Sequence, residues 1–194
     1  MRLIVITANW KILNEAQKIN QLFEEGLECL HFRKPNWNKS QWIDLLSQIK
    51  IQFHDKIMLH DYHELTQQFQ VKGVHLKEKH RNQIQDLKQY VTDFRQKGFQ
   101  VSTGFHSVEA IRKNTFLNFD YVFLSPVFNS ISKDNYSGKS FDVNGLDNAV
   151  YALGGIDKMN LNQVKNLGYT GAAVLGSVWK SEEEIQVFKN LFAN

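Results

Sequence analysis

The amino-acid sequence predicts an α/β fold, a single (β/α)8 TIM barrel formed by the whole chain, residues 1–194. Short apolar runs alternate with longer stretches in which apolar residues recur at helical spacing. About eight apolar runs are present, and strict alternation with helices implies parallel strands joined by right-handed crossovers. Eight such units close into a barrel, and a doubly wound open sheet is the alternative. No linker or low-complexity segment divides the chain, so one domain is expected.

The expected strands are short and continuously apolar, as is typical of parallel strands buried on both faces. They are residues 3–6, 27–32, 56–59, 73–76, 100–104, 121–124, 150–153 and 171–175. Amphipathic stripes predict the helices between them, for example the stripe in residues 14–25 that ends at Gly26. Ser181 and Glu184 have the spacing of a capping box for the last helix, and residues 126–148 are predicted as a loop.

Composition excludes several classes of protein. A single cysteine excludes a disulfide framework and a Cys-rich zinc site. The net charge is +3 and the basic residues are interleaved with acidic ones, so no nucleic-acid surface is indicated. No run approaches the roughly 18 apolar residues that cross a bilayer. We therefore expect no nucleic-acid partner, no membrane association and a cytoplasmic location.

Polar residue types follow the strands, where a barrel builds its active site. Gly154-Gly155 and Gly176-Ser177 follow the last two strands, which is where barrels often bind phosphate through backbone N–H groups. Ser130, Ser132 and Lys133 add hydroxyl donors and a cation after the sixth strand. This pattern predicts a phosphate site.

His106 is the leading acid–base candidate because it follows the fifth strand and precedes a helix. Arg33, directly after the second strand, can bind an anion in a bidentate manner. The remaining histidines near strand ends, together with Asp61, match no zinc signature, and His75 is predicted as a core residue. Only Asp61 among them is a hard ligand suited to Mg²⁺.

Six segments, in the right order, resemble the thiamine phosphate synthase and TenI family of small barrels. They are Leu-His-Phe-Arg-Lys at 30–34, His-Asp-Tyr-His-Glu-Leu at 60–65, Gly-Val-His-Leu at 73–76, Ser-Thr-Gly-Phe-His-Ser at 102–107, the stretch 121–133 and Ala-Leu-Gly-Gly-Ile at 152–156. Residues 171–177 also resemble the family's last strand. Each motif is weak alone, but their order makes the resemblance specific over nearly the whole chain.

The resemblance implies one of two activities. Synthases join a pyrimidine pyrophosphate to a thiazole phosphate carboxylate, release pyrophosphate and carbon dioxide, and need Mg²⁺. TenI-type members lack that reaction, and some convert the thiazole phosphate carboxylate into its aromatic tautomer with a histidine at the position of His106.

This chain departs from the synthase pattern at the metal and pyrophosphate end. The second magnesium aspartate is His80 here, the strand-2 glutamine is His31, a lysine is Pro35, and the asparagine before Asp61 is His60. Imidazole replaces oxygen poorly as a ligand of Mg²⁺. We therefore expect a TenI-type tautomerase without a cofactor. The alternatives are a divergent synthase that binds Mg²⁺ through Asp61, and a non-catalytic phosphate-binding regulatory barrel.

The expected roles follow from the resemblance. His106 moves the proton, and Asp61 orients or protonates a reacting group. Ser130, Ser132, Lys133, Gly155, Gly176 and Ser177 hold the phosphate of the thiazole. Arg33, His31, His60 and His80 contact the remaining anion or substrate. The expected partners are a small phosphorylated thiazole, a pyrimidine pyrophosphate under the synthase alternative, and a second copy of the chain in a homodimer.

Overall fold

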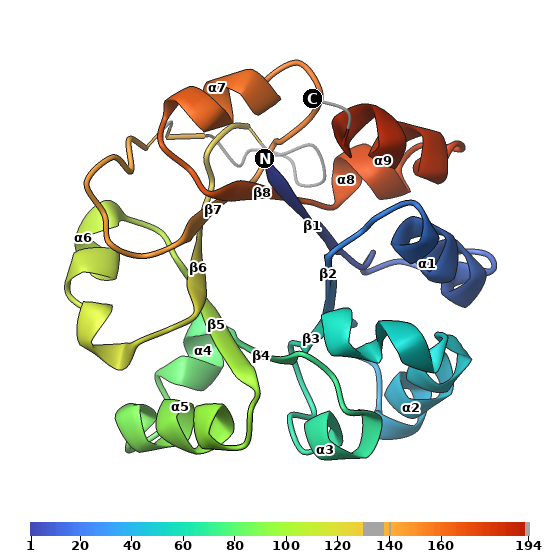
Figure 1. The fold of residues 1–194 in the computed structure, drawn as a ribbon, viewed down its shortest axis with the longest axis horizontal. Helices are drawn as coiled ribbons and strands as arrows, with labels where there is room; N and C mark the ends of the chain where they lie inside the picture. The colour runs from blue at the N-terminus through green and yellow to red at the C-terminus, as the bar shows by residue number, and fades with distance from the viewer. Residues whose placement is uncertain (130–137, 140, 193–194) are drawn as a thin grey trace.

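A closed barrel of eight parallel strands forms the centre of the computed structural model, which describes residues 1–129, 138–139 and 141–192. The strands follow one another around the barrel in chain order, and β8 closes it by pairing with β1 (Figure 1). The strands are β1 Arg2–Ile6, β2 Cys29–Phe32, β3 Ile57–Leu59, β4 Gly73–Leu76, β5 Gln100–Phe105, β6 Tyr121–Leu124, β7 Val150–Leu153 and β8 Gly171–Val174. The predicted (β/α)8 barrel is confirmed, with small shifts at the strand ends.

Helices surround the barrel on its outer side (Figure 1). The α-helices are α1 Glu15–Glu24, α2 Lys39–Gln48, α3 Leu65–Phe69, α4 Glu78–Arg81, α5 Leu87–Gln96, α6 Val108–Arg112, α7 Leu161–Asn166, α8 Gly176–Trp179 and α9 Glu184–Phe192. Two 3₁₀ turns cover Ile51–Lys56 and Thr115–Leu117. Among the residues with described positions, no helix is long and apolar enough to cross a membrane.

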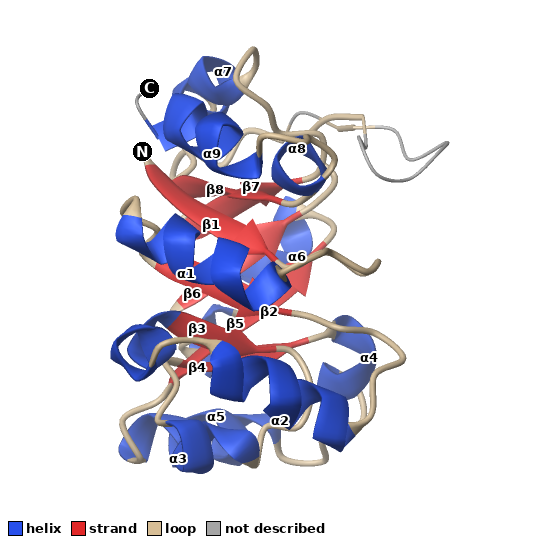
Figure 2. Ribbon diagram, turned by 90° about the vertical axis from the view of Figure 1, so that its right-hand side faces the viewer, coloured by secondary structure: helices blue, strands red, loops and turns tan. Residues whose placement is uncertain are grey.

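Successive side chains of a strand point to opposite faces, so each strand contributes to two apolar layers, one inside the barrel and one between the barrel and the helices. In β1, Leu3 and Val5 face the helices, whereas Ile4 and Ile6 belong to a smaller cluster inside the barrel. The strand arrows point toward one end of the barrel (Figure 2). Loops from all eight strands therefore converge at that end, where a barrel places its site.

Two short helices were not predicted, and one predicted cap is wrong. Helices α4 and α8 each contain only four residues, too few to show a helical period. Ser181 does not form a capping box with Glu184, because its Oγ accepts the N–H of Glu183 at 3.0 Å. Glu184 instead accepts a hydrogen bond from Lys18 of α1 at 2.5 Å, which ties the last helix to the first.

Candidate active site

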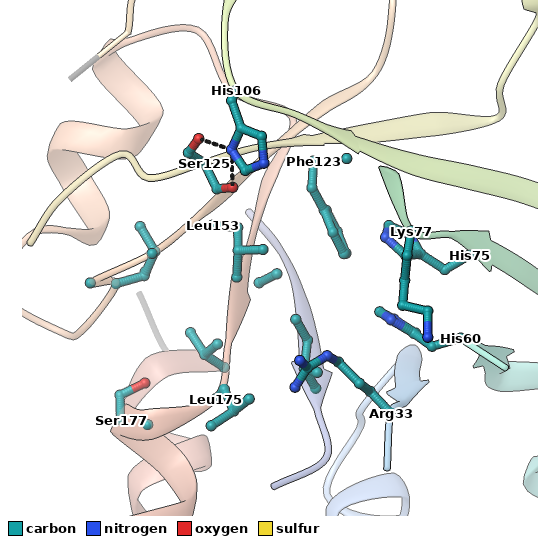
Figure 3. A pocket seen from close by; sticks show the side chains of 18 of the residues that line it. Arg33, His60, His75, Lys77, His106, Phe123, Ser125, Leu153, Leu175 and Ser177 are labelled. Carbon is teal, nitrogen blue, oxygen red and sulfur yellow. Dashed lines mark hydrogen bonds between the residues drawn. The ribbon is translucent and has the colours of Figure 1, made fainter. Parts of the chain in front are cut away.

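A cavity of about 350 Å³ opens at the carboxyl ends of the strands (Figure 3). Its walls combine apolar side chains, including Ile6, Phe123, Leu153 and Leu175, with a few charged and polar groups. A mainly apolar pocket with a few convergent polar groups is the usual form of a small-molecule site.

The loops after β7 and β8 form one side of the cavity. Gly155 has a φ of +67°, and a Cβ at this position would lie 2.1 Å from the carbonyl oxygen of Asn129. Only glycine fits this backbone, because it tolerates both the left-handed conformation and the close approach. Ser177 lies at the cavity, and its Oγ is buried with no hydrogen-bond partner among the described residues. A buried hydroxyl without a partner is costly unless a ligand binds it.

His106 lies at the mouth of the cavity, immediately after β5. Its Nδ1 donates to the carbonyl oxygen of Ser125 at 2.9 Å, as the dashed line in Figure 3 shows. Because a carbonyl only accepts, Nδ1 carries the proton, and Nε2 of the neutral ring has a free lone pair. Nε2 is 3.8 Å from Oε2 of Glu78, and both side chains are about half exposed. This tautomer can accept a proton from a bound molecule.

Two positively charged side chains, Arg33 and Lys77, lie on another part of the cavity wall. The backbone of Arg33 is held by Thr7, whose Oγ1 accepts from the N–H of Arg33 at 2.8 Å and donates to its carbonyl at 2.9 Å. Burial lowers the pKa of the Arg33 guanidinium, and the charge of Asp61 opposes this shift. Lys77 also lines the cavity and donates a hydrogen bond to the carboxylate of Asp61. Figure 3 shows Lys77 and Ser177 on opposite sides of the cavity.

The residues present do not fit the Mg²⁺ that the family resemblance implies. The carboxylate of Asp61 already pairs with the Lys77 ammonium. His80 does not reach Asp61 as a second ligand. Its ring lies 5.1 Å from that of His63, between centroids, and 6.4 Å from that of Tyr90. In the described part of the chain, Asp61 belongs to no group of three possible metal ligands. Mg²⁺ prefers oxygen ligands, and the carboxylate that the resemblance assigns to it is already paired with an ammonium group.

Three buried histidines lie close together at the cavity, one in β2, one directly after β3 and one in β4. We call His31, His60 and His75 the histidine floor, of which His60 and His75 line the cavity and His31 lies behind them. Nδ1 of His31 is 2.8 Å from Nε2 of His60. Burial is the main cause that lowers the pKa of all three rings, that of His75 to about 3. Neighbouring positive charges add to this shift, namely those of other histidines and, for His75, also Arg81, Arg33 and Lys77. The rings are therefore neutral at neutral pH.

The structure brings together part of the predicted site. Arg33, His60, His106, Gly155, Gly176 and Ser177 all line the cavity. Asp61, His31 and His80 do not line it, although Asp61 pairs with Lys77 and His31 contacts His60. Ser130, Ser132 and Lys133 lie outside the described residues.

Sequence reasoning missed three residues that the geometry makes important. Lys77 follows β4, and its place after a strand was the available signal for it. Arg81 donates to Oγ1 of Thr103 at 2.6 Å and to the carbonyl of Gly104 at 2.8 Å, which braces the end of β5. His75 was predicted as a core residue, and it is buried as expected, yet it also lines the cavity.

The closed (β/α)8 barrel and its cavity at the carboxyl ends of the strands define the class: a TIM barrel with its candidate site at the end where such barrels place their active sites. The sequence profile of the thiamine monophosphate synthase family (TMP-TENI) matches residues 3–178. The chain therefore belongs to the thiamine monophosphate synthase family.

Individual relatives agree with this family. A thiamine phosphate pyrophosphorylase from Bacteroides thetaiotaomicron has a similar structure, with a TM-score of 0.77, 30% identity, and coverage of 99% of this chain and 96% of the other. A thiamine-phosphate synthase of Limosilactobacillus reuteri is 26% identical over 191 residues, 90% of this chain and 85% of its own length. One from Staphylococcus epidermidis is 23% identical over 179 residues, 85% of this chain and 81% of its own. These names favour the synthase alternative over the tautomerase that we expected first.

Proposed function

We propose that this protein is a thiamine phosphate synthase that joins a pyrimidine pyrophosphate to a thiazole phosphate carboxylate. The phosphate end of the proposal rests on Oγ of Ser177, which is buried and has no hydrogen-bond partner in the described part of the chain, and on the close backbone turn at Gly155. A phosphate oxygen would satisfy this hydroxyl, and neighbouring backbone N–H groups bind anions well. The names of the relatives supply the reaction class.

The cavity suits the two substrates bound side by side, with their two aromatic rings in the middle and their phosphate groups at the two ends. The apolar walls at Ile6, Phe123 and Leu175 would contact the heterocycles, and the loops at Gly155 and Ser177 would hold the thiazole phosphate. Lys77, which Figure 3 shows across the cavity from Ser177, would bind the pyrophosphate together with Arg33. In the reaction, the bond between the pyrimidinylmethyl carbon and the pyrophosphate oxygen breaks. The thiazole nitrogen takes that carbon, the carboxylate leaves as carbon dioxide, and a proton takes up the electron pair left on the thiazole.

These residues can lower the barrier without a metal. Cations fixed next to the leaving group stabilise its developing charge without reorganisation during the reaction. Arg33 and Lys77 occupy that position in the proposal, while the cavity holds both rings in contact. Asp61 then acts as a positioning residue that orients the Lys77 ammonium.

Tautomerisation of the thiazole phosphate carboxylate is the second candidate. The free lone pair on Nε2 of His106 favours it, because a base at the mouth of the cavity can move a proton between ring and exocyclic carbons. Asp61 and His80 do not form a Mg²⁺ site, and this also favours the tautomerase, because the resemblance implies Mg²⁺ only for the synthase.

One assay separates the two candidates. The protein receives the thiazole phosphate carboxylate alone, then together with the pyrimidine pyrophosphate, each with added Mg²⁺ or with a chelator. We expect pyrophosphate release only with both substrates, and little loss with the chelator. Conversion of the thiazole alone, lost in His106→Asn, would replace the synthase by the tautomerase. The homodimer and the cytoplasmic location remain predictions.

A further inference from the structure

The histidine floor contains three side chains whose ring nitrogens converge in a buried place. One ring nitrogen from each of His31, His60 and His75 lies within 4.8 Å of the others. The ring centroids are 5.1 Å apart for His31 and His60, 5.1 Å for His31 and His75, and 4.2 Å for His60 and His75. Each of the three residues is at most 5% exposed. The three rings therefore surround one small volume at the base of the cavity.

Hydrogen bonds decide which nitrogens remain available. Nε2 of His31 is hydrogen-bonded to the hydroxyl of Tyr121 at 2.6 Å, and Nδ1 of His75 to Oγ of Ser102 at 2.9 Å. These contacts leave Nδ1 of His31 and Nε2 of His75. Histidines that bind metals usually have such a partner on the nitrogen that does not face the metal, which fixes the tautomer.

Nδ1 of His31 and Nε2 of His60 face each other at 2.8 Å, so a proton or another cation must lie between their lone pairs. Nδ1 of His60 is buried and has no partner among the described residues. If Nδ1 of His60 carries the proton of the neutral ring and Tyr121 accepts the proton of His31, both facing nitrogens present lone pairs. A metal ion satisfies this arrangement, whereas the hydrogen bond alone needs one ring in the other tautomer.

We propose that the histidine floor is a three-nitrogen site for a borderline transition-metal ion such as Zn²⁺. Imidazole suits Zn²⁺, Co²⁺ and Ni²⁺, and catalytic zinc sites keep three protein ligands and one open position. His60 and His75 line the cavity, so the open position would face a bound molecule. This inference does not depend on the proposed synthase reaction, and it concerns residues other than Asp61.

The charges around the floor limit the conditions under which a metal binds. Arg33, Lys77 and Arg81 all act on His75 as nearby positive charges. No carboxylate belongs to the three-residue ligand group. A divalent cation there needs an anionic fourth ligand, because an uncompensated buried charge is costly. We therefore expect an anionic oxygen, from inorganic phosphate or from a carboxylate, to bind the metal from the cavity side and to strengthen its binding.

The test is a titration of the metal-stripped protein with Co²⁺, followed by visible absorption. We expect one equivalent to give the absorption of a four- or five-coordinate ion, and Zn²⁺ to displace it. His60→Asn and His75→Asn should each weaken binding by more than about 100-fold, since even loss of a second-shell partner costs about 10- to 100-fold. His80→Asn is the matched control outside the floor and should bind as the wild type does. Inorganic phosphate or acetate should tighten binding in the wild type.

Wild-type protein alone also decides the question if the variants fail to fold. In ¹⁵N NMR of the imidazoles, Zn²⁺ should shift one ring nitrogen each of His31, His60 and His75. Co²⁺ absorption that is absent, or that is kept in both floor variants and lost in His80→Asn, would overturn the site. Unchanged nitrogen shifts at saturating Zn²⁺ would also overturn it, and would leave the floor as a hydrogen-bonded wall of the cavity.

Discussion

Lys77 is the residue that distinguishes this site from a magnesium site, because its ammonium pairs with Asp61. The two side chains are 42% and 31% exposed, so solvent and salt reach the pair. A divalent cation would have to displace the ammonium before it could bind Asp61. The ion pair with Lys77 therefore competes with any divalent cation for the Asp61 carboxylate.

Lys77→Met should free the Asp61 carboxylate and strengthen the binding of Mn²⁺, a paramagnetic substitute for Mg²⁺, measured by electron paramagnetic resonance. The same change should slow pyrophosphate release, because it removes a charge that we assign to the leaving group. Lys79→Met, at the exposed neighbour on α4, is the control and should change neither. Equal Mn²⁺ binding by wild type and Lys77→Met would contradict this role.

Lys34 shows the opposite case, an ion pair buried in the loops that support the site. Its Nζ donates to both carboxylate oxygens of Glu15 at 2.6 Å and to the carbonyl of Ala8 at 2.8 Å. The side chains are only 1% and 6% exposed. The pair joins the loop after β2, next to Arg33, to the start of α1.

Lys34→Met should lower the free energy of unfolding by about 3–5 kcal/mol, because it leaves the Glu15 carboxylate buried without a partner. Urea unfolding measures this change. The exposed pair of Lys39 and Glu64 provides the comparison, and Lys39→Met should cost less than about 1 kcal/mol. Similar costs for both substitutions would show that burial of the first pair is unimportant.

At the scale of elements, the loop after β7 depends on the backbone of Gly155. Gly155→Ala would place a Cβ 2.1 Å from the carbonyl oxygen of Asn129. Gly145 has a similar left-handed φ of +78°, but a Cβ there meets nothing within 4 Å in the described chain. Comparing the two glycines separates the close approach from the cost of the left-handed conformation.

Gly145→Ala should lower the free energy of unfolding by about 1–2 kcal/mol, the cost of a left-handed residue with a Cβ, and leave phosphate affinity unchanged. Gly155→Ala should cost more and should also weaken the binding of thiazole phosphate, measured by calorimetric titration. Unchanged affinity in Gly155→Ala would remove this loop from the phosphate site.

The sequence predicted strands better than short helices, for a physical reason. A buried parallel strand is recognisable as a continuous apolar run, and β4, β6 and β7 have the predicted bounds. Helix α8 reads Gly-Ser-Val-Trp and has no helical period of its own. Tertiary contact holds it, since Nε1 of Trp179 donates to the carbonyl of Ile6 at 2.8 Å. Such a contact cannot be seen in local sequence.

For the whole molecule, buried neutral histidines make stability depend on pH. The pKa of His63 is lowered to about 4 and that of His75 to about 3 by burial, and those of His31 and His60 lie well below their usual value. In the unfolded chain these rings take up protons below about pH 6.5, whereas the folded protein keeps them neutral. Stability is therefore complete above that pH and is lost as the pH falls toward the folded values.

The free energy of unfolding should fall between pH 7 and pH 5, by roughly 2 kcal/mol for each histidine held neutral at pH 5. Urea unfolding at pH 7, 6 and 5 measures this slope. His63→Gln should flatten it, because the variant removes one of the groups that protonate only on unfolding. A slope of zero, or stability that rises toward pH 5, would contradict the burial of neutral rings.

The barrel geometry explains which parts of the site the sequence could predict. Arg33, His106, Gly155 and Ser177 each follow a strand, and the closed barrel brings all such positions to one end. The histidine floor depends instead on register, because His31 lies beside Met58 and His75 beside Ser102 in neighbouring strands. A shift of one residue would turn either ring toward the helices. Spacing along the chain contains no information on that register.

The proposed reaction joins two heterocycles in the cavity, so detection of the joined product is its most direct test. The protein is incubated with the thiazole phosphate carboxylate and the pyrimidine pyrophosphate, and thiamine phosphate is measured after oxidation to its fluorescent form. We predict thiamine phosphate in an amount equal to the pyrophosphate released, with both reduced in Lys77→Met. Absence of thiamine phosphate from folded protein that binds the thiazole phosphate would contradict this proposal.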